Sequence, residues 1–175
     1  IQKVQPMIFV LAVATSLSIN DITFANKLIT LYKGKINISY RDEVIAVSRA
    51  LTDFSAGKYE NVKMITEDFK TRNASLYLFS KSTLLKALFE LKEDRNIMPL
   101  IDTTKHFLNR KLADRIVQKE SIFKFLNYLS SLCSVRRKNR RGAEILLDKI
   151  KDEKTFYQKK WVLSKAEEMV TGNRE

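Results

Sequence analysis

The chain has 175 residues, of which 45% are hydrophobic and 30% charged, a composition typical of a globular protein and not of a disordered one. Only 4 Gly and 2 Pro are present, too few turn-forming residues for an all-β fold. The single cysteine, Cys133, and the single histidine, His106, exclude an internal disulfide and a zinc site. The formal net charge of +12 favours binding to anionic partners.

The first expected element is a helix that includes residues 7–14, which are all apolar. This run follows Lys3 and ends in small residues, so the core of a signal peptide is the alternative interpretation. It is much shorter than the roughly 20 apolar residues of a transmembrane helix. We expect a buried first helix, because helical patterns continue along the rest of the chain. Since the chain begins at Ile1 without Met, we also expect it to be a piece of a longer protein or a processed product.

Further along the chain, apolar residues recur at helical spacing. Val44, Val47, Leu51 and Phe54 are spaced i, i+3, i+7 and i+10, which places them on one face of a helix. Six further stripes predict six further helical segments. In chain order they consist of Tyr59, Val62, Ile65 and Phe69; Leu76, Phe79, Leu84, Ala87, Leu88 and Leu91; Ile97, Ile101 and Leu108; Ile122, Phe125, Leu126, Leu129, Leu132 and Cys133; Ala143, Leu146, Leu147 and Ile150; and Phe156, Leu163, Ala166 and Val170.

Polar and helix-breaking residues lie between these stripes. Residues 39–42, Ser-Tyr-Arg-Asp, have the form of a capping box at a helix start. Gly57 lies where a helix end needs a residue that tolerates positive φ. Pro99 is tolerated in a first helical turn, which predicts a helix that begins near Asn96. The basic run 136–141 and the polar residues 152–154 predict two more breaks.

The helices are expected to form pairs that repeat along the chain. Ile29, Ile65 and Ile101 each lie in the second helix of a pair and are separated by 36 residues, and the equivalent residue in the next pair is about Leu147, 46 residues further on. A period of this length predicts a stacked all-α array of antiparallel helix pairs, with the first helix of each pair lining the concave side. The expected single domain, 1–175, contains repeats 5–38, 39–73, 74–111 and 112–152 and a closing helix at 155–171.

The segment Ala50–Val62 resembles the turn of a tetratricopeptide repeat, in which one helix ends before a Gly-x-Tyr and the second helix begins. The segment 86–97 has the same pattern, in which one helix ends and the next begins, but it lacks the Gly and Tyr. The segment Lys160–Glu168 is similar to the closing helix of uncharacterised bacterial helical-repeat proteins, in their C-terminal part. This resemblance covers most of the chain and implies a tetratricopeptide-like scaffold that binds other proteins. The periods of 36 and 46 and the Val at 62 depart from the family pattern, so no peptide-binding residue is transferred.

We expect no catalytic, cofactor-binding or metal-binding residues, and therefore no enzyme. His106 has no Cys or Ser partner near it in sequence, which favours an ordinary surface residue of a helix. Cys133 falls on an apolar stripe, which favours a buried packing thiol over a nucleophile. The four glycines do not form a phosphate-binding loop.

The most distinctive local feature is a basic region between Lys105 and Arg141, which contains 11 Lys and Arg against 2 acidic residues. Such a concentration favours contacts with phosphates. The alternative is a solvated surface, in which some of the cations interact favourably with helix C-termini. Lys124 would extend the candidate basic patch that these residues form. The candidate basic patch consists of Arg110, Lys111, Arg115, Lys119, Arg136, Arg137, Lys138, Arg140 and Arg141.

The predicted function is a non-enzymatic protein–protein interaction or scaffolding domain, and the predicted partner is another protein. Its contact residues are expected among polar positions of first helices, such as Ser48, Arg49 and Asp53. The alternative function is binding of nucleic acid through the basic patch. We expect no cofactor, a cytoplasmic location, and no membrane association, because the apolar faces are needed for stacking.

Overall fold

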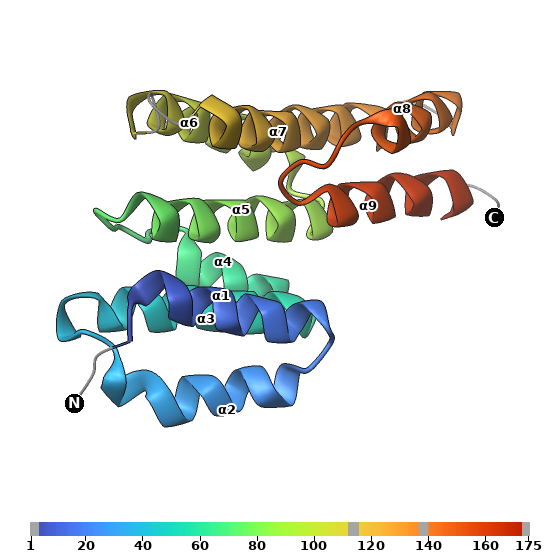
Figure 1. The fold of residues 1–175 in the computed structure, drawn as a ribbon. Helices are drawn as coiled ribbons and strands as arrows, with labels where there is room; N and C mark the ends of the chain where they lie inside the picture. The colour runs from blue at the N-terminus through green and yellow to red at the C-terminus, as the bar shows by residue number, and fades with distance from the viewer. Residues whose placement is uncertain (1–3, 112–115, 137–139, 173–175) are drawn as a thin grey trace. The chain divides into compact units, whose positions relative to one another are not determined.

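A computed structural model describes residues 4–111, 116–136 and 140–172 of the chain, without the side chains of 116, 117 and 140 (Figure 1). Within these residues all regular elements are helical, which confirms the predicted all-α class. None of the described helices is long and apolar enough to cross a membrane. In chain order the elements are α1 Pro6–Ser18, α2 Ile22–Tyr32, the 3-10 turns η1 Lys33–Lys35 and η2 Ile38–Tyr40, α3 Arg41–Ser55, α4 Tyr59–Thr66, α5 Ala74–Glu90, α6 Asp94–Lys111, α7 Ile116–Arg136, α8 Arg140–Asp152 and α9 Lys159–Gly172.

The chain forms two compact units, Ile1–Glu93 and Asp94–Glu175. Unit 1 contains α1 to α5, and unit 2 contains α6 to α9. Helices α1 and α2, α3 and α4, and α7 and α8 each pack together as neighbours in the chain. The boundary between the units falls within the expected repeat 74–111. The repeat limits therefore remain a prediction.

In unit 1 the first helix of each expected pair ends in the same backbone turn. Asn20, Gly57 and Lys92 follow α1, α3 and the last turn of α5, with φ of 60°, 72° and 61°. In all three turns the amide of this residue donates to the carbonyl three residues earlier, and the next amide donates to the carbonyl five residues before it. This double hydrogen bond is the Schellman motif, which satisfies the free carbonyls of a helix end. The positive φ expected at Gly57 is confirmed.

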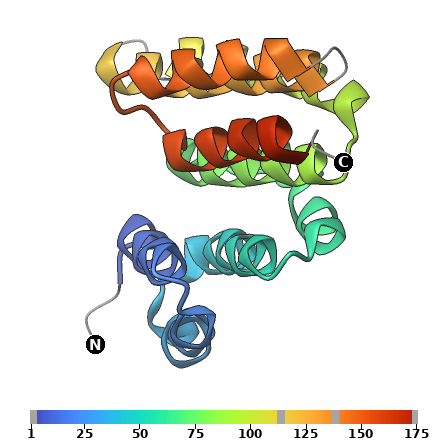
Figure 2. The same cartoon turned by 90° about the vertical axis from the view of Figure 1, so that its right-hand side faces the viewer.

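The helices of unit 1 pack in a recurring order. α1 packs on α2 and α3, α3 packs on α4 and α5, and α4 packs on α5. Figure 2 shows α1, α3 and α4 side by side, with α2 against α1. This arrangement is compatible with a helical-repeat array, in which each pair covers the apolar face of the next. Two groups of buried side chains form the core: Phe9, Val10, Val13, Ala25, Ile29, Ile36, Val44, Val47 and Leu76; and Ala50, Val62 and Ala87.

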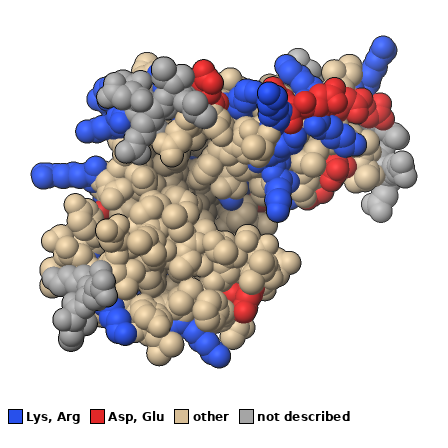
Figure 3. Space-filling model, in the orientation of Figure 1, with Lys and Arg blue, Asp and Glu red and all other residues tan. Residues whose placement is uncertain are grey.

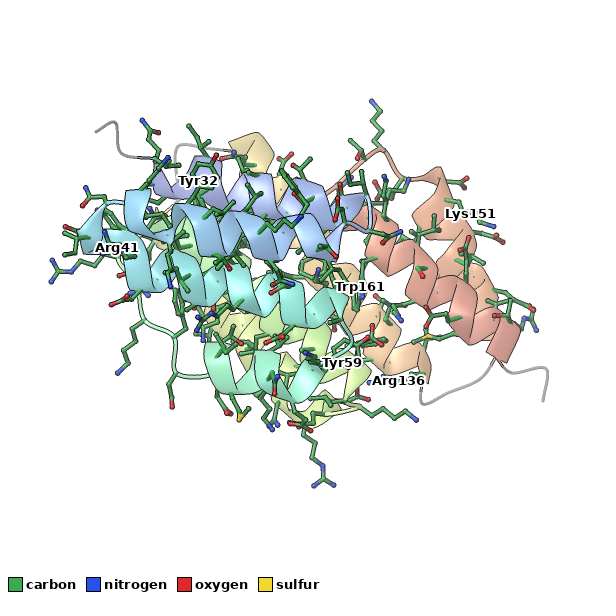
Figure 4. The ribbon with its side chains drawn as sticks, turned by 90° about the horizontal axis from the view of Figure 1, so that it is seen from below. Tyr32, Arg41, Tyr59, Arg136, Lys151 and Trp161 are labelled. Carbon is green, nitrogen blue, oxygen red and sulfur yellow. The ribbon has the colours of Figure 1, made fainter. Side chains whose placement is uncertain are left out.

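The start of α3 differs from the expected capping box. Its N-cap is Tyr40, which makes no side-chain cap, whereas Asn37 Oδ1 accepts a hydrogen bond from the Ser39 amide and caps η2. The guanidinium of Arg41 donates to the carbonyls of Gly34 and Ile36, both at 3.3 Å (Figure 4). The two 3-10 turns are thus fixed by side chains before α3 begins.

In unit 2, α6 packs on α7, α7 packs on α8, and α9 covers both α7 and α8. Phe125 of α7 meets Tyr157 and Trp161 edge-on, with ring centroids 5.7 and 6.4 Å apart. Tyr128 stacks on Phe156 at 5.1 Å. These aromatic contacts attach α9 and the segment before it to α7. The break predicted at 152–154 agrees with the end of α8 at Asp152.

The expected start of α6 near Asn96 is wrong by two residues, because α6 begins at Asp94 and Pro99 lies inside it. The Asp94 carboxylate pairs with Arg136 at the end of α7, and a carboxylate in the first turn stabilises a helix start. The same ion pair shows that α6 and α7 run antiparallel.

Candidate functional site

The first group of basic-patch residues lies where α6 ends and α7 begins. Arg110 and Lys111 are exposed in the last turn of α6, and among the described residues neither forms an ion pair. Lys119 of α7 is half-buried, with its Nζ 5.8 Å from the centroid of the Phe123 ring. Because α6 and α7 are antiparallel, these cations occupy the same end of the helix pair. They form what we call the first basic group.

The second group lies at the opposite end of α7 and the start of α8. Arg136 is mostly buried and pairs with Asp94, so its charge stabilises the packing of α7 against α6. Arg141 is exposed on α8. Arg115, Arg137 and Lys138 and the side chain of Arg140 lie outside the described residues.

The structure therefore separates the two ends of the predicted patch. Lys119 and Arg136 are 17 residues apart on one continuous helix, which corresponds to about 26 Å at 1.5 Å per residue. A stretch that reads as one basic region in sequence is divided into two groups in space, because α7 holds its ends apart.

Acidic residues pair with some of the basic residues of unit 2 and neutralise part of their charge. Lys124 pairs with Glu153 at 2.6 Å, and the Tyr128 hydroxyl donates to the other carboxylate oxygen of Glu153 at 3.3 Å. The hydrogen bond from Lys124 is the main reason that the pKa of Glu153 lies below its usual range. Burial, followed by the charge of Glu153, raises the pKa of the Tyr128 hydroxyl. Lys124, which the sequence offered as an extension of the patch, is therefore engaged within unit 2, and Figure 3 shows Lys and Arg alternating with Asp and Glu there.

Sequence reasoning missed two buried lysines in α5 of unit 1. Lys81 is 8% exposed, and its Nζ donates to the carbonyls of Thr66 and Glu67 at 2.9 and 3.0 Å. These carbonyls end α4, so Lys81 takes the place of a helix C-cap. Burial lowers the pKa of Lys81, opposed by the charges of Asp68 and Glu67.

Lys86 is 7% exposed, and its Nζ lies 4.5 Å from the centroid of the Phe54 ring on α3. Burial lowers the pKa of Lys86 to about 8, against the charge of Glu90. The sequence signal for this buried lysine is its position in the middle of the otherwise apolar run 84–89. Ordinary snorkelling of lysine stems makes that signal weak.

The remaining candidates occupy the positions expected for structural residues. His106 is exposed on α6, and Cys133 is buried on α7. In the part of the chain that the structure describes, no three His, Cys, Asp or Glu side chains come together in a way that could hold a metal ion. Ser48, expected on an accessible face of α3, is fully buried, whereas Arg49 is exposed and Asp53 half-buried.

Comparison of the chain with protein-family models, with curated proteins and with solved structures found no match in any of the three.

Proposed function

We propose that the chain is a non-enzymatic protein-interaction or scaffolding domain, built as a tetratricopeptide-like array of helix pairs. The observation that supports this most strongly is the recurrence in unit 1. Three successive first helices end in the same Schellman turn, at Asn20, Gly57 and Lys92, and α1, α3 and α5 pack on one another in order. Arrays of this kind present an extended surface along their first helices, which is the surface they use to bind other proteins.

The proposed contact surface is the outward face of α3. Asp42, Arg49 and Asp53 are spaced i, i+7 and i+11, so they lie on one side of this helix. Asp42 and Arg49 are exposed, whereas Val44 and Val47 are fully buried in the core. Charges of both signs on this face suit a partner segment that carries complementary charges.

The test is capture of a partner by the immobilised chain from an extract of cells that make it. We expect a protein retained by the wild-type chain to be lost from a double variant, Asp42→Lys with Arg49→Glu, because both substitutions place like charges opposite the partner. A Lys70→Glu variant, changed at an exposed residue outside the helices, is the matched control and should retain the partner. A partner bound equally by all three forms would rule out this face.

Binding of nucleic acid through the first basic group is the second candidate. It is favoured by Arg110 and Lys111, which are exposed and form no ion pair with another described residue, at the same end of the helix pair as Lys119. If each of the three neutralises one phosphate, replacing all three with Ala should reduce the slope of log K against log salt by about 2.7. Between 50 and 200 mM salt, the loss of affinity for duplex DNA should then be about 40-fold smaller than for the wild type. An Arg136→Ala variant is unsuitable here, since it breaks the ion pair with Asp94.

A further inference from the structure

A half-buried aromatic ring lies beside the first basic group. Phe123 is one turn after Lys119 on α7, and the Nζ atom of this lysine lies 5.8 Å from the centroid of the ring. The other aromatic residues of α7, Phe125 and Tyr128, are buried, and their rings pack on aromatic side chains of α9 and of the segment before it. Phe123 is thus the aromatic residue of α7 that keeps part of its ring at the surface.

A second cation lies level with this ring on the facing helix, α6. The Ser130 hydroxyl of α7 donates to the Met98 sulfur of α6 at 3.4 Å, so these two residues face each other. Seven residues make about two helical turns. Because α6 and α7 are antiparallel and packed together (Figure 1), two turns forward along α6 and two turns back along α7 lead from this pair to Lys105 and Phe123. The Phe123 ring therefore has Lys119 on its own helix and the half-buried Lys105 on the other.

The described surface around this ring is more basic than acidic. The last nine residues of α6, from 103 to 111, contain three cations and no acidic residue. Together with Lys119 they outnumber the two exposed acidic residues of the neighbouring turns, Asp102 and Glu120. An anionic partner is therefore favoured, and the small excess of positive charge predicts binding that weakens as the salt concentration rises.

The aromatic ring distinguishes single-stranded from duplex nucleic acid. Phosphates are present in both, so cations alone bind either form. An aromatic side chain stacks on the face of a base, and the base faces are hidden in a duplex but accessible in a single strand. Such stacking requires no particular sequence, because every base has a flat face. A ring with a cation on either side therefore suits a nucleotide whose base stacks on the ring and whose neighbouring phosphates contact the cations.

We propose that the first basic group, together with Phe123 and Lys105, binds single-stranded nucleic acid. One base stacks on the Phe123 ring, and the phosphates on its two sides contact Lys105 and Lys119. This inference rests on the second candidate function and names the form of nucleic acid that the site takes. It also adds Phe123 and Lys105 as contact residues, neither of which belongs to the candidate basic patch predicted from the sequence.

The test is fluorescence anisotropy of the whole chain at about 50 mM salt with two labelled probes, a thymidine oligonucleotide of about 16 nucleotides and a mixed-sequence DNA duplex of the same length. We expect the single strand to bind more tightly than the duplex. Phe123→Ala should weaken binding of the single strand at least about fivefold, because one stacked base is lost, and should leave binding of the duplex unchanged. Lys105→Ala should reduce the slope of log K against log salt for the single strand by about 0.7, the value for one phosphate contact.

Two further variants at this position separate the loss of stacking from a loss of folding. Phe123→Leu keeps an apolar side chain at a half-buried position but removes the ring, so it should lose binding of the single strand as Phe123→Ala does. Phe123→Tyr keeps the ring and should retain binding. Circular dichroism of all three variants should match that of the wild type. Tyr40→Ala, at an aromatic residue of unit 1 that is 38% exposed, is the matched control and should bind both probes as the wild type does.

The outcomes distinguish this inference from the function on which it rests. Equal affinity for the single strand and the duplex, with both lost when Arg110, Lys111 and Lys119 are replaced with Ala, would support binding of nucleic acid but overturn the preference for single strands. Binding of the single strand that is unaffected by Phe123→Ala would also overturn the inference. A chain that binds neither probe would overturn it together with the second candidate function.

Discussion

The buried ammonium group of Lys86 predicts an unusual dependence of stability on pH. Burial lowers its pKa from 10.5 to about 8 in the folded state, while the unfolded chain keeps a value near 10.5. Between these two pH values the unfolded state binds the additional proton, so the free energy of unfolding rises with pH. Below pH 8 both states are protonated, and the cost of the buried charge is fully present.

The expected magnitude follows from the two pKa values. Between pH 7 and pH 10, linkage gives a gain of about 2.5 kcal/mol in the free energy of unfolding from this single group. Replacement of Lys86 with Met removes the titrating group but keeps an unbranched chain of similar length. The Met variant should be more stable than the wild type at pH 7 by about 1 to 2 kcal/mol, because the loss of the contact with the Phe54 ring offsets part of the gain.

The assay is guanidinium unfolding followed by circular dichroism, at pH 7, 8, 9 and 10, on the wild type and on the Lys86→Met variant. Other groups titrate in both proteins, so the difference between the two curves isolates Lys86. We expect the advantage of the variant to shrink as the pH rises and to change sign between about pH 8.7 and pH 9.5, because neutral Lys86 is no longer penalised by burial. A difference that is constant from pH 7 to pH 10 would refute the reasoning.

Two further predictions concern the turns and the helix pairing. Gly57→Ala should destabilise unit 1 by about 1 to 2 kcal/mol in thermal unfolding, because φ at this residue is +72°. A Cβ at this position meets no atom within 4 Å, so the cost comes from the backbone conformation alone. Gly34→Ala is the control, and an equal loss of stability in both variants would contradict this explanation. Arg136→Ala should destabilise unit 2 by about 2 kcal/mol, since the side chain of Asp94 is only 13% exposed and loses its ion pair with Arg136. Arg141→Ala, at an exposed site, should change stability by less than about 0.5 kcal/mol, and a loss as large as that of Arg136→Ala would show that the ion pair with Asp94 is not the cause.

The sequence alone predicted which segments are helical and where most of them end. Apolar residues at helical spacing and the near absence of Gly and Pro reflect local physics, namely which faces of a helix avoid water. For the same reason the left-handed turn at Gly57 could be predicted, since glycine tolerates positive φ. The equivalent turns at Asn20 and Lys92 were not predicted, because both residues occur in many other conformations, and it is the hydrogen bonds of the helix end that hold them at positive φ here.

The tertiary structure alone decided which faces are covered and which charges are paired. Periodicity predicts which residues share a face of a helix but not what packs against that face, so Ser48 of α3, expected among the contact residues, is fully buried. The basic region between Lys105 and Arg141 is one patch in sequence, yet the length of α7 separates its ends, and Asp94 pairs with Arg136. Lys86 is charged in sequence and buried in the structure, because packing of the neighbouring helices outweighs the cost of removing one ammonium group from water.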